Sequence, residues 1–147
     1  MNSDANMPCT DCVTRRTFLT QSAMMAAVAA LAACGAASDA TAPNLTSTVT
    51  VKLSDQPALA NIGGVALVTL GGSPFAIVRI GTASFVTVSR VCPHQGSIVN
   101  KSGNGFLCPN HGAQFSTVGT WTGGQQTSNL RSYPTSYDAS TDLITIG

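Results

Sequence analysis

Two short loops, each holding one cysteine and one histidine, constrain this chain more than any other feature. The first reads Cys-Pro-His-Gln-Gly from Cys92, and the second reads Cys-Pro-Asn-His-Gly from Cys108. Thiolates and imidazoles are common metal ligands in proteins. Each loop offers one of each, so we expect Cys92, His94, Cys108 and His111 to hold a metal group together. The fold therefore has to bring the two loops side by side.

The segment after residue 45 is rich in Val, Thr, Ile, Ser and Gly, which is typical of short strands joined by tight turns. Phe85, Thr87 and Ser89 alternate with Val86 and Val88, the period-two pattern of a half-buried strand, and no helical stripe of useful length follows residue 45. Strands are predicted at Thr48–Leu53, Val65–Leu70, Phe75–Ile80, Phe85–Ser89, Gly105–Cys108, Ala113–Ser116, Arg131–Tyr137 and Leu143–Ile146. We therefore expect an all-β fold, a small antiparallel sandwich or open barrel with both metal loops at one end.

Composition excludes several functions. The net charge is +1, and Glu is absent, so no basic patch is available to bind nucleic acid. The sequence has two histidines, His94 and His111. Both belong to the metal loops, so neither remains for the two-histidine, one-carboxylate iron site of an oxygenase or for a nucleophile–histidine pair. We therefore expect this chain to lack a complete catalytic site of its own.

The combination C-P-H-x-G and C-P-x-H-G-A-x-F resembles the Rieske family of [2Fe–2S] proteins, over about residues 48–147 and including the late Tyr133-Pro134 pair. The resemblance implies one [2Fe–2S] cluster, with the two thiolates on one iron and the two imidazoles on the other. It also implies that the chain is an electron carrier or a redox subunit. The residues expected around the cluster are Gln95, Gly96, Gly112, Ala113 and Phe115. A Cys₂His₂ zinc site is an alternative that the interleaved order of ligands disfavours. A disulfide between Cys92 and Cys108 is another, disfavoured by the neighbouring histidines.

Four positions depart from the high-potential members of that family, the Rieske subunits of cytochrome bc complexes. Those members carry an extra cysteine in each loop, joined as a disulfide, where this chain has Ser97 or a near neighbour and Asn110. They also place a serine and a tyrosine, which donate hydrogen bonds toward sulfur, where this chain has Ala113 and Phe115. Rieske centres span about −150 to +300 mV, and we expect a potential in the lower half of that range.

The N-terminal segment has the features of an export leader. Residues 14–20 read T-R-R-T-F-L-T, which resembles a twin-arginine signal, and an uncharged, Ala-rich run follows to Ser38. The run contains Leu-Ala-Ala-Cys-Gly, which resembles a lipobox with Cys34 as the lipid-carrying residue. An uncleaved signal anchor is the alternative, because about 20 uncharged residues can span a bilayer. The Cys9-x-x-Cys12 pair lies before the arginines and is not expected to bind metal.

These patterns divide the chain into a signal segment (1–34), a flexible tether (35–47) and a Rieske domain (48–147). We expect the domain to be membrane-anchored outside the cytoplasm, through a lipid on Cys34 or through the signal segment. Its partner is expected to be a redox protein such as a cytochrome, a reductase or an oxidoreductase subunit. A subunit of a bc-type quinol oxidase and a structural zinc-binding lipoprotein are the alternative functions.

Overall fold

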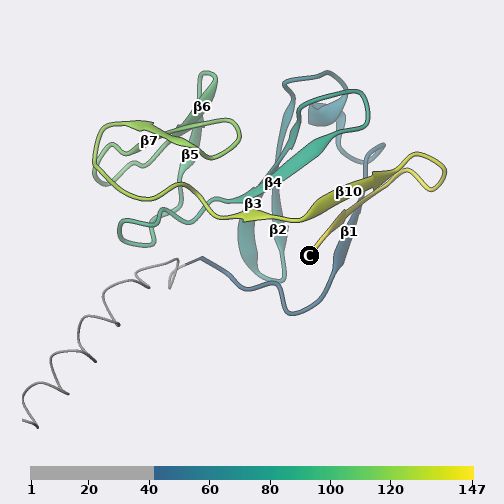
Figure 1. Cartoon of the computed structure of the whole chain (residues 1–147), viewed down its shortest axis with the longest axis horizontal. Coiled ribbons are helices and arrows are strands. Elements are labelled where there is room, and N and C mark those ends of the chain that lie inside the picture. The colour runs from purple at the N-terminus through teal and green to yellow at the C-terminus, as the bar shows by residue number, and fades with distance from the viewer. Residues whose placement is uncertain (1–41) are drawn as a thin grey trace, which may run out of the picture. The chain divides into compact units, whose positions relative to one another are not determined.

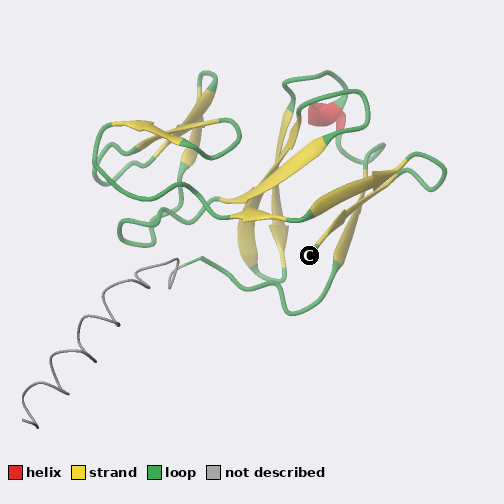
Figure 2. Ribbon diagram, in the orientation of Figure 1, coloured by secondary structure: helices red, strands yellow, loops and turns green. Residues whose placement is uncertain are grey.

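The computed structural model of the chain describes residues 42–147, and strands dominate this part (Figures 1 and 2). Its elements are β1 (Val49–Lys52), the 3₁₀ turn η1 (Pro57–Leu59), β2 (Val65–Leu70), β3 (Ser73–Arg79), β4 (Phe85–Ser89), β5 (Asn100–Ser102), β6 (Gly105–Leu107), β7 (Gln114–Ser116), β8 (Trp121–Gly123), β9 (Ser132–Tyr133), β10 (Thr135–Asp138) and β11 (Leu143–Ile146). Within the described residues, no helix is long and apolar enough to cross a membrane. The all-β prediction is confirmed.

The strands form three antiparallel sheets, in the orders β1-β11-β10, β2-β3-β4-β9 and β5-β6-β7-β8. In Figure 1, β5, β6 and β7 lie together on one side of the domain, and β1, β2, β3, β4 and β10 lie on the other. The chain leaves β4, forms the third sheet, and returns to β4 as β9, where Thr87 pairs with Tyr133. Both predicted metal loops lie in this excursion, one before β5 and one between β6 and β7.

Strand β3 is the centre of the fold because both of its faces are buried. Phe75 and Ile77 point into a core shared with the β1-β11-β10 sheet, where Ile144 and Ile146 are fully buried. The alternate residues of β3, Ala76 and Val78, point into a second core shared with the β5–β8 sheet. Alternation of side chains along a strand thus lets one strand join two cores. The second core contains the two cysteines of the metal loops, Cys92 and Cys108.

Most predicted strands are present, and β2, β4 and β11 have the predicted bounds. The prediction of one strand over Arg131–Tyr137 is wrong, because Pro134 divides it. Proline has no backbone N–H to donate, so it cannot continue a ladder on both sides. Before Pro134 the chain pairs with β4, and after it the chain pairs with β11, so this residue carries the chain from one sheet to another. Strands β5 and β8 were not predicted.

The predictions for the N-terminal segment concern mostly residues that the structure does not describe. The arginine pair, Cys9, Cys12, Cys34 and the signal segment all lie outside the described residues, as does the tether up to residue 41. The end of the predicted tether is described, and it contacts the domain. The Tyr133 hydroxyl donates to the carbonyl of Pro43, Arg131 donates to the Asn44 side chain over 2.8 Å, and Leu45 packs against the core. Any free tether therefore ends before Pro43.

The guanidinium of Arg79, the last residue of β3, joins the loops at one end of the β2-β3-β4-β9 sheet. Arg79 donates to the carbonyl oxygens of Leu59 and Ala60 at 3.0 Å each, to Gly81 at 3.2 Å and to Thr82 at 2.6 Å. It therefore ties η1 to the turn between β3 and β4. Four carbonyl groups depend on one side chain, and lysine has no planar fork with which to replace it.

We predict that Arg79→Ala lowers the free energy of unfolding by about 2–3 kcal/mol, because hydrogen bonds to a charged group are lost together. Lys101→Ala is the matched control, since Lys101 is exposed and donates to one carbonyl only. Urea unfolding followed by circular dichroism measures both variants. Equal midpoints for the two variants would contradict the assigned role of Arg79.

Asp142 joins the β10–β11 hairpin to the end of β1. Its backbone lies in the left-handed region (φ 58°), and its carboxylate accepts from the Ser54 N–H at 3.0 Å and from the Tyr137 hydroxyl at 3.1 Å. The hydrogen bond from the Ser54 N–H is the main reason that the pKa of this carboxyl lies below its ordinary value of 3.8. A lowered pKa in the folded state means that the ionised carboxylate stabilises the fold.

We predict that Asp142→Asn lowers the melting temperature by a few degrees at neutral pH. The stabilisation is fully present above the carboxyl's ordinary pKa and is lost as pH falls through the lowered folded value. The difference between variant and parent should therefore shrink toward zero in acid. Asparagine tolerates the left-handed backbone, so it changes the charge without straining the turn. Melting curves from pH 7 to pH 3 measure this, and a difference that stays constant over that range would refute it.

Candidate metal centre

The first loop is closed by two backbone hydrogen bonds around Cys92. The N–H of Cys92 donates to the carbonyl of Ser97 at 2.7 Å, and the N–H of Gly96 donates to the carbonyl of Cys92 at 2.8 Å. Gly96 has φ +74°, a conformation that glycine adopts without a steric penalty. At the base of the loop, the Arg90 guanidinium donates twice to the carbonyl of Val99, at 3.1 and 2.9 Å. The loop is thus held at its base and at its turn.

The second loop repeats the same backbone arrangement. The N–H of Cys108 donates to the carbonyl of Ala113 at 2.8 Å, and the N–H of Gly112 donates to the carbonyl of Cys108 at 3.0 Å. Gly112 has φ +71°, close to the value for Gly96. Cysteine and glycine occupy equivalent places in the two loops, whereas the histidine is two residues after the cysteine in one and three residues after it in the other. Two copies of one turn therefore present the four predicted ligands.

The two cysteines are buried and are not joined to each other. Cys92 is 0% exposed and Cys108 is 2% exposed, and both thiols are free. The disulfide alternative is therefore wrong. Burial is the main cause that raises the pKa of the Cys92 thiol above its ordinary value, and the neighbouring Cys108 side chain adds to it. The backbone N–H groups of His94 and Gln95 oppose that rise by hydrogen bonding to the sulfur. A bound metal would displace the thiol proton, and the same two N–H groups would then donate to the thiolate.

The two histidine rings lie beside each other at the loop tips. Their centroids are 4.8 Å apart and the rings meet edge-on at 88°. His94 is half-buried, and its Nδ1 atom is fully buried without a hydrogen-bond partner among the described residues. His111 is exposed. A buried, unpartnered ring nitrogen is costly unless another group binds it, and a metal would satisfy it.

A single zinc ion and a [2Fe–2S] cluster are the two metal groups that this donor set could hold. No three His, Cys, Asp or Glu side chains in residues 42–147 converge as they would around one metal ion. A [2Fe–2S] cluster takes two protein ligands on each iron. The paired cysteines Cys92 and Cys108 and the paired histidines His94 and His111 offer that division. These residues fit the cluster.

Of the remaining predicted site residues, Gln95, Gly96, Gly112 and Ala113 lie in the two loops and Phe115 lies in β7. Ala113 and Phe115 are buried in the core with the cysteines, at 0% and 2% exposure, and neither side chain carries a donor. Gly124 packs against the second loop so closely that a Cβ there would lie 1.8 Å from the carbonyl oxygen of Gly112. Trp121 packs against the same core and donates from its indole N–H to the carbonyl of Gln125 at 3.0 Å.

Sequence reasoning missed two contacts at this site. Arg90 clamps the first loop, and a lone arginine in the sequence carries no signal of that role. The Asn110 side chain donates to the Ser97 hydroxyl at 2.6 Å, joining the two loops. The sequence analysis singled out Ser97 and Asn110 because they replace the disulfide-forming cysteines of high-potential Rieske proteins. That comparison predicted the absence of a disulfide but not the hydrogen bond between the two residues.

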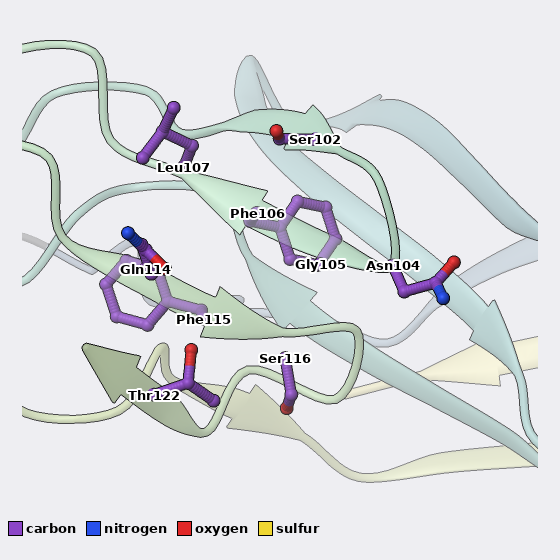
Figure 3. Close-up of a pocket in the computed structure, with 9 residues that line it drawn as sticks. All are labelled: Ser102, Asn104, Gly105, Phe106, Leu107, Gln114, Phe115, Ser116 and Thr122. Atoms are coloured by element: carbon purple, nitrogen blue, oxygen red, sulfur yellow. The ribbon is translucent and has the colours of Figure 1, made fainter. Parts of the chain in front are cut away.

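A hollow of about 480 Å³ lies on the β5–β8 sheet, and its lining includes Leu107 and Gln114 on either side of the second loop (Figure 3). Its lining residues are Ser102, Asn104, Gly105, Phe106, Leu107, Gln114, Phe115, Ser116 and Thr122. None of these side chains is titratable or a strong metal ligand. Acid–base and metal chemistry are therefore absent from the hollow, and the paired loops remain the candidate site.

Comparison with known proteins identifies the family. A model of the Rieske [2Fe-2S] domain matches residues 49–134, more than half of the chain. Among solved structures, the plasma-membrane Rieske protein PetC3 from Synechocystis PCC 6803 is 26% identical, with a TM-score of 0.54, and the match covers 67% of this chain and 98% of that one. No protein among those with curated descriptions matches the chain significantly.

The fold is shared with a much larger enzyme. The quaternary ammonium Rieske monooxygenase CntA, in its apo form, is 19% identical with a TM-score of 0.55. The match covers 69% of this chain and 32% of that chain, so the likeness concerns one domain of the enzyme and its fold alone. A Rieske domain carries a [2Fe–2S] cluster, so the alternative of a zinc site is wrong. This chain belongs to the Rieske [2Fe-2S] domain family.

Proposed function

We propose that this protein carries single electrons through a [2Fe–2S] cluster bound by Cys92, His94, Cys108 and His111. The observation that carries the proposal is the pairing of two buried thiols with two edge-on imidazoles on matched turns. When bound, the cluster accepts and releases one electron. The chain's own residues decide where that electron can enter and leave.

The two ends of the site differ in their access to solvent. The thiols lie inside the core, where neighbouring apolar side chains exclude water. The His111 ring lies at the surface, so a redox partner docked on the loop tips would approach that ring directly. We infer that electrons pass through the histidine end, with the cysteine end as the buried anchor.

We further propose that the domain is exported and held at a membrane. The support is the sequence: a twin-arginine pattern, an uncharged run, and Cys34 in a lipobox-like setting. Twin-arginine export carries folded proteins, which suits a cluster inserted in the cytoplasm. An acyl group on Cys34 would provide the anchor, and an uncleaved signal segment is the alternative. Similarity to a plasma-membrane Rieske protein is in keeping with that location.

A bc-type quinol oxidase subunit is the second candidate. Two observations disfavour it: Ser97 and Asn110 form a hydrogen bond where a disulfide would join the loops, and Ala113 and Phe115 offer no donor toward sulfur. Two missing charge-assisted hydrogen bonds correspond to about 3 kcal/mol, or roughly 130 mV for one electron. A measured potential near the top of the Rieske range would favour the bc-type role.

We predict that the reduced protein gives the low-average-g paramagnetic resonance spectrum of a histidine-ligated [2Fe–2S] centre. Cys108→Ser and His111→Ala should each lose that spectrum and the bound iron, because each removes a ligand. Ser102→Ala, an exposed residue of the same sheet, is the control and should keep both. Full iron content and an unchanged spectrum in either ligand variant would overturn the assignment.

We predict that Ala113→Ser raises the midpoint potential by roughly 60 mV, since one new hydroxyl donor near sulfur stabilises the reduced state by about 1.5 kcal/mol. Ala113→Gly alters the same position without adding a donor and should move the potential far less. Protein-film voltammetry at fixed pH measures both variants. Equal shifts in the serine and glycine variants would show that the hydroxyl has no part in setting the potential.

A further inference from the structure

We propose that the hydrogen bond between Ser97 and Asn110 is the brace that holds the two loop tips together and keeps the imidazole pair in place. The proposal rests on the proposed ligand set and adds a positioning role for two residues that bind no metal themselves. The Asn110 side-chain nitrogen lies 2.6 Å from the Ser97 hydroxyl oxygen. This bond joins the two loops near their exposed tips, whereas the side chains of Cys92 and Cys108 meet in the buried core.

Both partners are rigidly connected to predicted ligands. The carbonyl of Ser97 accepts from the Cys92 N–H at 2.7 Å, so Ser97 is tied to the first cysteine through the backbone. Asn110 directly precedes His111, inside the turn that the Gly112 N–H closes onto the carbonyl of Cys108. A displacement of either partner therefore moves a loop that carries ligands.

The two ends of the site are fixed by different forces. Cys92 and Cys108 are packed in the core, and the Arg90 clamp closes the base of the first loop. Asn110 and His111 are exposed, so packing does little to hold them. The Ser97–Asn110 bond and the edge-on contact of the two rings remain as the links between the tips. Loss of the bond should therefore open the site at its histidine end first.

The test compares the rate of cluster loss in variants of the loaded, full-length protein. Asn110→Ala and Ser97→Ala each remove the bond, and we expect the cluster to be lost to an excess of a ferrous chelator about fivefold to tenfold faster, as for one hydrogen bond near 1–1.5 kcal/mol. The decay of visible circular dichroism gives the rate. The double variant should be no faster than either single variant, because both break the same bond.

Two further variants separate bracing from general damage. Ser97→Thr keeps the hydroxyl and should keep the parent rate. Asn104→Ala removes an exposed asparagine from the β5–β6 turn and should also keep the parent rate. In Asn110→Ala, the paramagnetic resonance spectrum should broaden, because the histidine pair samples more than one arrangement, while the melting temperature stays close to that of the parent.

Each outcome is decisive for the brace. It is overturned if Asn110→Ala and Ser97→Ala lose the cluster at the parent rate, if their effects add in the double variant, or if Ser97→Thr behaves like Ser97→Ala. Failure of the proposed function looks different, since the parent protein itself would then show no [2Fe–2S] spectrum. A loaded parent with unaffected variants would refute the brace and leave the electron-carrier role intact.

Discussion

The burial of two cysteines in a core between two sheets is the constraint on which this structure depends. Cys92 and Cys108 lie with residues of β2, β3 and β4 on one side and of β6 and β7 on the other. A metal group held by these cysteines would lie against this core, which joins the β5–β8 sheet to β3. Because β3 is buried on both faces, its other face packs against the β1-β11-β10 sheet.

The cysteine end of the site is consequently buried, and the histidine end is open to solvent. Burial stabilises the neutral thiol, and only a bound metal and the N–H groups of His94 and Gln95 favour the thiolate. At the other end, the Nδ1 atom of His94 is buried without a hydrogen-bond partner among the described residues, whereas the His111 ring is exposed to solvent. An electron carrier needs this division, because its redox centre has to be shielded from water and still lie close to a docked protein.

Local patterns in the sequence predicted the parts of the fold that local chemistry determines. The bounds of β4 and both loop turns were predicted because alternation, proline and glycine act over a few residues. The expectation that β4 is half-buried was wrong, because both of its faces are buried. Strands β5 and β8 were missed because no apolar alternation marks them: β5 is exposed throughout, and no residue of β8 is fully buried. The break at Pro134 was not predicted because it depends on the pairing of one segment with strands of two different sheets. The Ser97–Asn110 bond depends on residues thirteen apart meeting in space, which no window of sequence reveals.

A covalent link between the loop tips would hold them more firmly than this hydrogen bond does. A disulfide closing a loop of about 15 residues contributes about 3 kcal/mol in the chain-entropy model, against about 1 kcal/mol for a hydrogen bond. The turns themselves also hold the loops. Gly96 and Gly112 close each loop with matched backbone bonds, and Gly124 adds a backbone contact that any side chain would prevent. The rigidity of this metal centre therefore comes mainly from its backbone, and the side-chain brace completes it.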